Sequence, residues 1–311
     1  MPVGPGESST LIRRVQSPPV PELPDLDVVA DALHAALAGR PVLAARAAMP
    51  LSVRGTPAEL DALAGQEVAR IARVGKFLDV ALARDSVVIN PMLTGRFQLA
   101  GRGEKARTGV AVELRFGPRR GGRPSDAAPW TAGAPWLPEI GAEVVLRYRD
   151  PTQMGKVYLL PAGVERPVPG RGPGELGPDA LDPGLTLEAW RERIRRHPGE
   201  LKNLLRNQAF VAGIGNAYSD EILFEARLAP FRKRSSLAPG EVDELYAAMR
   251  RTLEASIRLL RERVPPTFET QVRDHLAVHG KGAGPCPRCG GRLTQVSAGG
   301  FPTGYCRSCQ R

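Results

Sequence analysis

The hydrophobic pattern of the sequence changes at residues 161–183, a segment rich in proline and glycine, and this change restricts the fold more than any other feature. Before this segment, Val110, Val112, Leu114 and Phe116 alternate with smaller or polar residues, which is the period of a half-buried strand. After it, apolar residues recur every three or four positions, which is the helical period. Strands followed by helices predict an α+β protein with more than one domain.

Local signals predict three helices. Asp25 and Asp27 are acids suited to the N-terminus of the first. Thr186 is a candidate N-cap for the second, and Pro239 begins a third that ends before Pro265. The apolar residues at helical spacing are Leu26, Val29, Leu33 and Leu37, then Leu187, Trp190 and Ile194, then Val242, Leu245, Met249, Leu253, Ile257 and Leu260. The stretch 117–138 is expected to be a surface loop.

The charge distribution favours a polyanionic partner. The 311 residues include 43 Lys or Arg and 33 Asp or Glu, which gives a net charge of +10. Residues 191–311 hold 21 basic and 12 acidic side chains, so nearly all of the excess lies in the C-terminal part. Binding of phosphates releases counterions, which makes nucleic acid the leading candidate. The alternative is a solvated basic surface that reflects overall composition.

The sequence has no apolar run of transmembrane length, and residues 1–20 lack the apolar core of a secretory signal. We therefore expect a cytoplasmic protein without membrane association. Residues 1–20 are rich in Pro, Gly and Ser without periodicity, which predicts a disordered extension. All four cysteines lie within the last 26 residues, so the rest of the chain has no thiols for a disulfide framework.

Two Cys-x-x-Cys pairs, Cys286 with Cys289 and Cys306 with Cys309, are separated by 16 residues. This spacing is typical of zinc ribbons that present four thiolates tetrahedrally. Four protein ligands leave no position for water, so we expect one structural Zn²⁺ that holds a hairpin together. A redox pair or disulfides are the alternatives, and the expected cytoplasmic location argues against both.

Four stretches, in this order, resemble the motifs of one family. PELPDLD at 21–27 is similar to its N-terminal motif, and RVGKFL at 73–78 is similar to its lysine-bearing strand. VAGIGNAYSDE at 211–221 resembles its helix-two-turn-helix signature, and the cysteine ribbon ending at Gln310 resembles its zinc finger. The chain thus resembles the formamidopyrimidine-DNA glycosylase and endonuclease VIII family over residues 21–311.

The resemblance implies that an amine attacks the anomeric carbon of a damaged nucleotide, expels the base and forms an iminium that promotes phosphate elimination. Pro21 would supply the amine, because a terminal amine has a pKa of about 8 against about 10.4 for lysine. Glu22 would be the acid-base residue that assists opening of the sugar ring, and Lys76 would contact the adjacent phosphate. Asn216 would also contact phosphate, at a helix N-terminus that presents free amides.

The resemblance also implies an α+β multidomain architecture with an N-terminal β-sandwich and leading helix, a helical helix-two-turn-helix domain and a C-terminal zinc-ribbon hairpin. We expect a bifunctional DNA glycosylase and abasic-site lyase of base excision repair. It would act as a monomer on oxidised bases in damaged double-stranded DNA, associated with the nucleoid. The expected parts are a disordered extension (1–20), a catalytic β-sandwich domain (21–160), a linker (161–184), a helix-two-turn-helix domain (185–270) and a zinc finger (279–311).

Several positions depart from the family pattern. Phe301 stands five residues before the third cysteine, where the family usually has an arginine that contacts the lesion phosphate. Thr152 stands where a cation would face the orphaned base, whereas Leu93 and Met154 can still wedge into the vacated stack. The segment 264–279 is shorter than in purine-specific members, so the resemblance does not imply a preference for 8-oxoguanine.

Pro21 lies inside the chain, where its nitrogen is an amide without a nucleophilic lone pair. We expect translation to start at Val20, through a GTG codon, and the initiator to be removed before Pro21. Removal of Met1 alone would expose Pro2, but Val3 then stands where the mechanism needs a carboxylate.

Each candidate residue also has a structural interpretation. Pro21 and Pro24 can stiffen the entry to a helix, Glu22 can cap that helix, Lys76 can be a solvated strand residue, and the glycines at 213–215 can form a simple turn. One alternative function is a catalytically impaired lesion- or abasic-site-binding protein of the same fold. Another is a zinc-ribbon nucleic-acid module unrelated to repair.

Overall fold

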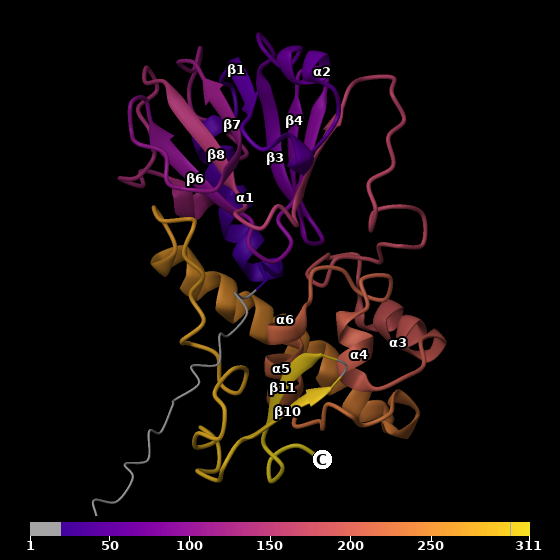
Figure 1. Ribbon diagram of the computed structural model, residues 1–311. Coiled ribbons are helices and arrows are strands. Elements are labelled where there is room, and N and C mark those ends of the chain that lie inside the picture. Colours follow the sequence, from indigo (N-terminus) through magenta and orange to yellow (C-terminus); the bar gives the residue numbers. More distant parts are fainter. Residues whose placement is uncertain (1–19, 299) are drawn as a thin grey trace, which may run out of the picture.

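The computed structural model describes residues 20–298 and 300–311, shown as a ribbon in Figure 1. The predicted disordered extension, residues 1–20, therefore lies outside the described residues except for the exposed Val20. The described part combines sheets and helices, as the predicted α+β class requires. No helix within it has both the length and the hydrophobicity needed to cross a membrane.

Two sheets form the N-terminal half. Their strands are β1 (Val42–Ala47), β2 (Val53–Arg54), β3 (Val68–Val74), β4 (Phe77–Leu82), β5 (Ser86–Asn90), β6 (Arg96–Gly101), β7 (Val110–Phe116), β8 (Val144–Arg149) and β9 (Lys156–Leu160). One sheet has the order β1-β7-β8-β6 and is antiparallel throughout. The other has the order β2-β9-β5-β4-β3, in which only β2 and β9 are parallel. Figure 1 shows them side by side, which confirms the predicted β-sandwich.

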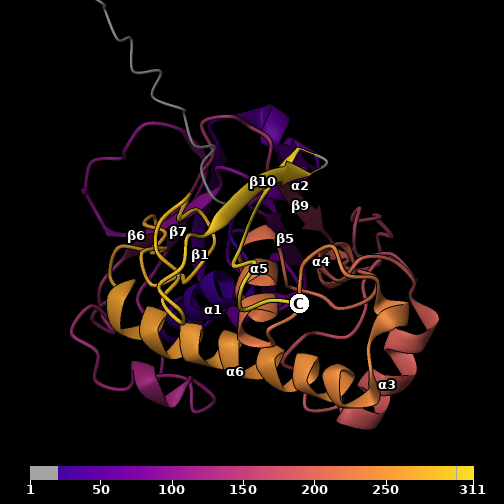
Figure 2. The ribbon, with the colours of Figure 1, turned by 90° about the horizontal axis from the view of Figure 1, so that it is seen from below.

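Helices dominate the C-terminal half. It contains α3 (Leu187–Arg196), α4 (Leu201–Arg206), α5 (Asn216–Glu225) and α6 (Pro239–Arg263), with a 3-10 turn at Arg234–Ser236. The N-terminal half contributes α1 (Leu23–Leu37) and α2 (Pro57–Asp61), with 3-10 turns at Pro50–Ser52 and Pro129–Thr131. Two predicted helix starts are confirmed, because Thr186 accepts a hydrogen bond from the Ala189 amide and Pro239 is the first residue of α6. Figure 2 shows α6 running beneath α1 and α5. A hairpin of β10 (Thr294–Ala298) and β11 (Phe301–Tyr305) follows.

Helix α1 lies between the sheets and the C-terminal helices (Figure 1). Its first turn is capped by Asp25, whose carboxylate accepts a hydrogen bond from the Glu22 amide at 2.8 Å. Buried side chains of α1, including Leu26 and Leu33, belong to one hydrophobic cluster that continues from the sheets into the helical half. Because its apolar residues face both halves, α1 holds the start of the chain against the helices.

Strand β7 follows the predicted alternation only in part. Val112, Leu114 and Phe116 are buried as expected, but Val110 is half-buried and Ala111 is buried. The register of β7 against β8 shifts between Val110 and Val112. Such an irregularity inserts one extra residue and turns the neighbouring side chain to the other face, so the prediction is wrong at Val110.

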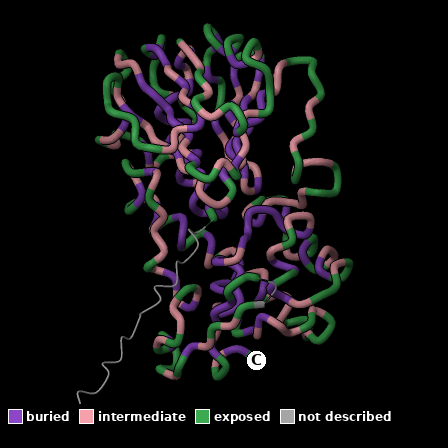
Figure 3. The backbone as a smooth tube through the Cα atoms, in the orientation of Figure 1, coloured by how far each residue is buried: buried purple, intermediate pink, exposed green. Residues whose placement is uncertain are grey.

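Residues 161–185 contain no helix or strand and lie largely at the surface, as Figure 3 shows. The stretch 117–138 is less exposed than predicted. Leu137 is buried in it, and the Trp130 ring nitrogen donates a hydrogen bond to Asp31 of α1 at 2.7 Å. The expectation of a surface loop is therefore wrong in part, because its tryptophans supply apolar area that packs against α1.

Candidate active site

The first turn of α1 packs directly against the turn that precedes α5. The Leu23 amide donates a hydrogen bond to the Gly213 carbonyl at 3.0 Å. A Cβ atom on Gly213, whose φ is +98°, would lie 2.7 Å from Leu23, and one on Gly215 would lie 2.4 Å from the Glu22 carboxyl carbon. Neither position has room for a side chain. The two glycines therefore allow Glu22 and Leu23 to reach the N-terminus of α5.

Glu22 is at the centre of this contact, with 2% of its surface exposed. Its carboxylate accepts hydrogen bonds from the amides of Gly215 at 2.7 Å, Ala217 at 2.8 Å and Tyr218 at 3.2 Å. The carboxylate thus lies at the N-terminus of α5, where the helix dipole stabilises negative charge. The expectation that this terminus presents free amides to phosphate is wrong for these three groups, because Glu22 occupies them.

Lys76 lies in the two-residue turn between β3 and β4, and not on the strand itself. Gly75 adopts a φ of +59° in this turn. Burial lowers the pKa of the half-buried Lys76; the negative charge of Glu22 opposes this, and the positive charge of Arg206 adds to it. Within the described residues, the Lys76 ammonium forms no hydrogen bond or ion pair. It is therefore a cation in the field of Glu22 that is available to a ligand.

Pro21 is buried beside Glu22, with its nitrogen in peptide linkage to Val20. Arg273 donates a hydrogen bond to the Val20 carbonyl at 3.5 Å and pairs with both carboxylate oxygens of Asp25, one of them at 2.7 Å. Burial lowers the pKa of Arg273, but Asp25, Tyr218 and Glu22 together raise it more, so the net shift is upward. Sequence reasoning missed Arg273, since no motif marks it and its partner Asp25, although part of the N-terminal motif, lies 248 residues away.

Asn216, the first residue of α5, connects this helix to the C-terminal hairpin. Its Nδ2 donates to the Pro302 carbonyl at 2.9 Å, whereas its buried Oδ1 has no partner among the described residues. The Lys202 ammonium donates to the same carbonyl at 3.1 Å and to the Asp220 carboxylate at 2.6 Å. Asp220 also accepts from the Gly304 amide at 3.0 Å. Sequence reasoning missed Lys202 and Asp220, which are buried and fix the hairpin to α5.

Leu93 and Met154 lie in two loops of the sheet half that are joined to each other. The hydroxyl oxygens of Thr94 and Thr152, one in each loop, are 2.5 Å apart. Met154 is 47% exposed, whereas Leu93 is half-buried. The neighbouring Met92, which the sequence did not single out, is 41% exposed and has a φ of +46°. Leu93 and Met154 thus belong to loops that contact each other through Thr94 and Thr152.

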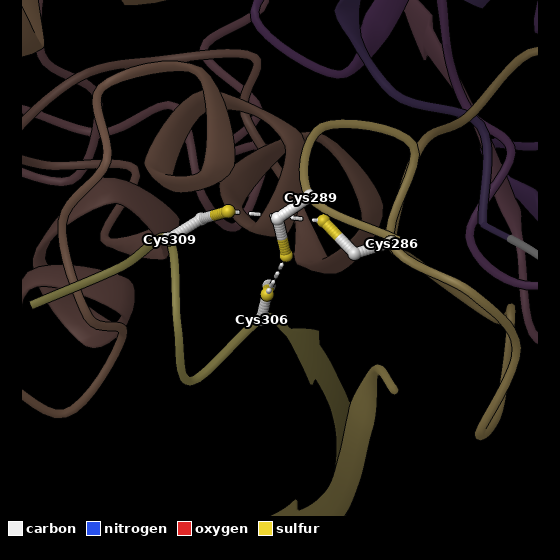
Figure 4. A group of neighbouring side chains, drawn as sticks. All are labelled: Cys286, Cys289, Cys306 and Cys309. Atoms are coloured by element: carbon white, nitrogen blue, oxygen red, sulfur yellow. Dashed lines mark hydrogen bonds between the residues drawn. The ribbon is translucent and has the colours of Figure 1, made fainter. Parts of the chain in front are cut away.

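The four cysteines converge next to the hairpin (Figure 4). All are free thiols, and their sulfur atoms lie within 4.8 Å of one another. The Sγ atoms of Cys286 and Cys309 are 3.9 Å apart, and those of Cys289 and Cys306 are 3.6 Å apart. Four sulfurs placed tetrahedrally at about 2.3 Å from one ion are separated by about 3.8 Å. The cluster therefore fits a single four-coordinate metal ion with no position for substrate.

The structure brings most of the predicted residues to one place. Pro21, Glu22 and Asn216 meet where α1 contacts α5, and Lys76 lies within electrostatic reach of Glu22. Among the described residues, no hydrogen bond joins Glu22 to the apolar loops of the sheet half or to the cysteine cluster. This arrangement pairs a fixed buried carboxylate with an unpaired cation, which is suited to acid-base chemistry beside an anionic group.

Two family models match the chain. The model for the formamidopyrimidine-DNA glycosylase N-terminal domain matches residues 20–157, and that for the formamidopyrimidine-DNA glycosylase H2TH domain matches residues 176–264. A formamidopyrimidine-DNA glycosylase from Thermomicrobium roseum is 32% identical over 302 residues, which cover 94% of this chain and 99% of the relative. Another from Pelotomaculum thermopropionicum is 28% identical over 302 residues, with 94% and 99% coverage.

Solved structures share the fold. The complex of Lactococcus lactis Fpg (MutM) with DNA containing N7-benzyl-Fapy-dG matches with a TM-score of 0.76 and 22% identity, over 94% of this chain and 100% of that one. The MutM (Fpg) protein of Thermus thermophilus matches with a TM-score of 0.71 and 26% identity, over 93% and 98%. These similarities confirm the predicted sandwich, the helix-two-turn-helix domain and the C-terminal cysteine hairpin.

Proposed function

The chain belongs to the formamidopyrimidine-DNA glycosylase family, and from this premise we propose that it is a bifunctional DNA glycosylase and abasic-site lyase that removes oxidised bases. The observation that carries the proposal is the position of Glu22. Glu22 directly follows Pro21 in the sequence, and its carboxylate is buried and fixed by hydrogen bonds from three backbone amides. The carboxylate also interacts electrostatically with Lys76. A group held this rigidly can act on a substrate without reorganisation.

Pro21 supplies the nucleophile in a chain that begins at this residue. Its free secondary amine attacks C1′ of the damaged nucleotide, the bond to the base breaks, and the base leaves with the bonding electrons and a proton. Glu22 donates a proton to the ring oxygen, which opens the sugar and leaves an iminium on Pro21. The iminium acidifies C2′; loss of a proton there expels the 3′ phosphate, and hydrolysis of the imine restores the amine.

The substrate is damaged double-stranded DNA. Asn216 lies between two residues whose amides bind Glu22, and Lys76 lies within electrostatic reach of Glu22, which supports a contact of both with phosphates around the flipped nucleotide. The apolar side chains of Leu93 and Met154 fill the gap that the nucleotide leaves. Flipping costs a few kcal/mol, and the weaker pairing of a lesion reduces this cost.

The metal in this proposal is one structural Zn²⁺ bound by Cys286, Cys289, Cys306 and Cys309, since a closed shell of four thiolates suits zinc. Metal analysis of the purified protein tests it. We propose the parts 21–160, 161–184, 185–270 and 279–311 as catalytic domain, linker, helix-two-turn-helix domain and zinc finger. The protein acts as a monomer in the cytoplasm, on DNA of the nucleoid.

Covalent trapping tests the reaction. Protein that begins at Pro21 is incubated with DNA containing an oxidised base or an abasic site, and borohydride is added to reduce the imine. We expect a stable protein–DNA adduct. The matched control carries one extra residue before Pro21, which turns the amine into an amide but leaves the side chains unchanged, and it should give no adduct. Binding of lesions without trapping or nicking by the Pro21 form would instead support a catalytically impaired lesion-binding protein.

A further inference from the structure

An arginine and a phenylalanine beside the proposed site have no role in the mechanism above. The guanidinium carbon of Arg206, the last residue of α4, lies 3.7 Å from the centre of the Phe301 ring. Phe301, the first residue of β11, is 45% exposed, and Arg206 is half-buried. Within the described chain, the Arg206 guanidinium forms no hydrogen bond or ion pair. It is therefore a fixed cation without an anionic partner.

Contact with an aromatic face leaves the guanidinium able to bind an anion. Its five N–H donors lie in the plane of the guanidinium, and none of them is used by another group of the described chain, so all remain available. The ring restrains the side chain, so less conformational freedom is lost on binding. Burial lowers the pKa of Arg206, while the charges of Glu22 and Asp220 oppose this. Both carboxylates already accept hydrogen bonds elsewhere, so neither neutralises it.

Contacts in the hairpin place this pair next to the proposed site. Pro302 follows Phe301, and its carbonyl accepts hydrogen bonds from Asn216 at the N-terminus of α5 and from Lys202. A cavity of about 270 Å³ opens there, and Arg206, Phe301 and Lys202 are among its lining residues. Lys202, which lines the cavity, thus shares the Pro302 carbonyl with Asn216, the first residue of the helix whose N-terminus Glu22 occupies.

Electrostatics favours an anion at this place. Arg206 lowers the pKa of Lys76, which means that the two cations lie close enough to repel each other. At Lys76 the attraction of Glu22 exceeds the repulsion of Arg206, and burial leaves the pKa of Lys76 below its ordinary value. A phosphodiester between the two cations would relieve this repulsion.

We propose that Arg206, held against Phe301, binds a DNA phosphate next to the damaged nucleotide, together with Lys76. The inference rests on the proposed function. The phosphate-binding cation then comes from Arg206 of α4. Strand β11 contributes the aromatic ring of Phe301, which supports this cation, and not an arginine of its own. Arg206 acts as a substrate-binding residue and takes no part in proton transfer.

The test measures binding of the full-length protein to duplex DNA with a tetrahydrofuran abasic-site analogue at several salt concentrations. We expect Arg206→Leu to weaken binding about 10- to 100-fold, because a charged hydrogen bond is lost. The magnitude of the slope of log affinity against log salt should fall by about 1, which is the change expected for the loss of one phosphate contact. Arg102→Leu is the matched control, since Arg102 is 71% exposed. Its partner Glu143 still has an ion pair with Arg115, at 3.4 Å, after the substitution. Its affinity and slope should equal those of the wild type.

Two further variants separate charge from support. Phe301→Leu should weaken binding a few-fold with an unchanged salt slope, because the cation stays but its support is lost. The exchange variant Arg206→Leu with Phe301→Arg should recover the wild-type slope, because it returns a cation to the same place. Thermal melting followed by circular dichroism establishes that each variant is folded. A folded Arg206→Leu protein with wild-type affinity and slope would overturn the proposal.

Borohydride trapping on the same duplex with a natural abasic site in place of the tetrahydrofuran analogue, which has no C1′ aldehyde to react, keeps this inference separate from the proposed function; the chain used begins at Pro21. A wild type that binds DNA but forms no adduct contradicts the catalytic proposal, and the salt slope of Arg206→Leu still decides the role of Arg206. A wild type that forms the adduct while Arg206→Leu binds equally well contradicts the assignment of Arg206 alone.

Discussion

Two buried glutamates of this protein accept similar hydrogen bonds but have neighbours of opposite charge. Glu22 accepts hydrogen bonds from three backbone amides within 215–218. Glu221 accepts three from residues 277–279, at 2.7, 3.0 and 2.8 Å. Glu22 reaches α5 from the other half of the molecule, whereas Glu221 belongs to α5 and fixes the segment that leads to the cysteines. Hydrogen bonds from backbone amides therefore do not distinguish a catalytic carboxylate from a structural one.

The surrounding charges do distinguish them. Burial raises the pKa of Glu221, the three amides lower it in part, and the neighbouring Asp220 raises it again. Glu22 instead acts on Lys76 and Arg206, two cations without an ion-pair partner among the described residues. Unpaired cations beside a fixed carboxylate indicate a place for an anionic substrate, because such cations are costly to bury without one.

The largest expected effect comes from replacing one glutamate at a time. Glu22→Gln should lower excision of an oxidised base about 10²- to 10⁴-fold, because the amide cannot transfer the proton. Glu221→Gln is the matched control and should keep activity within a few-fold. Each variant leaves an amide donor without an acceptor, so each should lose about 1–3 kcal/mol of unfolding free energy. Single-turnover nicking and urea unfolding measure the two effects, and equal losses of activity would refute the distinction between the glutamates.

An intermediate effect is expected in the pH dependence of stability. The pKa of Glu221 is raised by folding, so between about pH 4.3 and that raised value the folded protein holds a proton that the unfolded chain has released. Stability should fall as pH rises through this window, by at most about 1.4 kcal/mol per pH unit. Urea unfolding across this range should show the slope in the wild type and its loss in Glu221→Gln. Parallel curves would show that Glu221 ionises normally.

The smallest effect is expected at Lys76. Because burial lowers its pKa, its contact with phosphate is complete below that pKa and is lost as pH rises through it. Lys76→Arg keeps its charge at any pH in this range. Fluorescence anisotropy with abasic-site DNA should therefore show wild-type affinity falling a few-fold relative to Lys76→Arg toward alkaline pH. If both proteins respond identically, Lys76 does not contact a phosphate.

Several features of the fold were predictable because they depend on neighbours in sequence. The N-cap at Thr186, the start of α6 at Pro239 and the early helix follow from local hydrogen-bonding and backbone preferences. The spacing of the cysteines likewise predicted a cluster of four thiols. The alternation rule failed at Val110, since a register shift depends on the partner strand and leaves no signal in the strand itself.

The sequence predicted which residues belong to the site but not how they contact one another in space. The motifs singled out Glu22 and the glycine turn before α5 but did not reveal how the two are related, since the amides assigned to phosphate are bound by Glu22. Lys202 was missed because its partners lie between 18 and 101 residues away. Phe301 was noted only as an absent cation, while the structure places Arg206 against it.

By itself, the sequence determined which chemical groups the chain can use: one early Pro-Glu pair, a lysine turn, a glycine turn and four thiols in ribbon spacing. Only the tertiary structure decided which of two similarly bonded glutamates lies among unpaired cations, and which arginine stands beside Phe301. The physical reason is that electrostatic and aromatic contacts depend on distance in space, and packing of α1 against α5 brings together residues that are far apart along the chain.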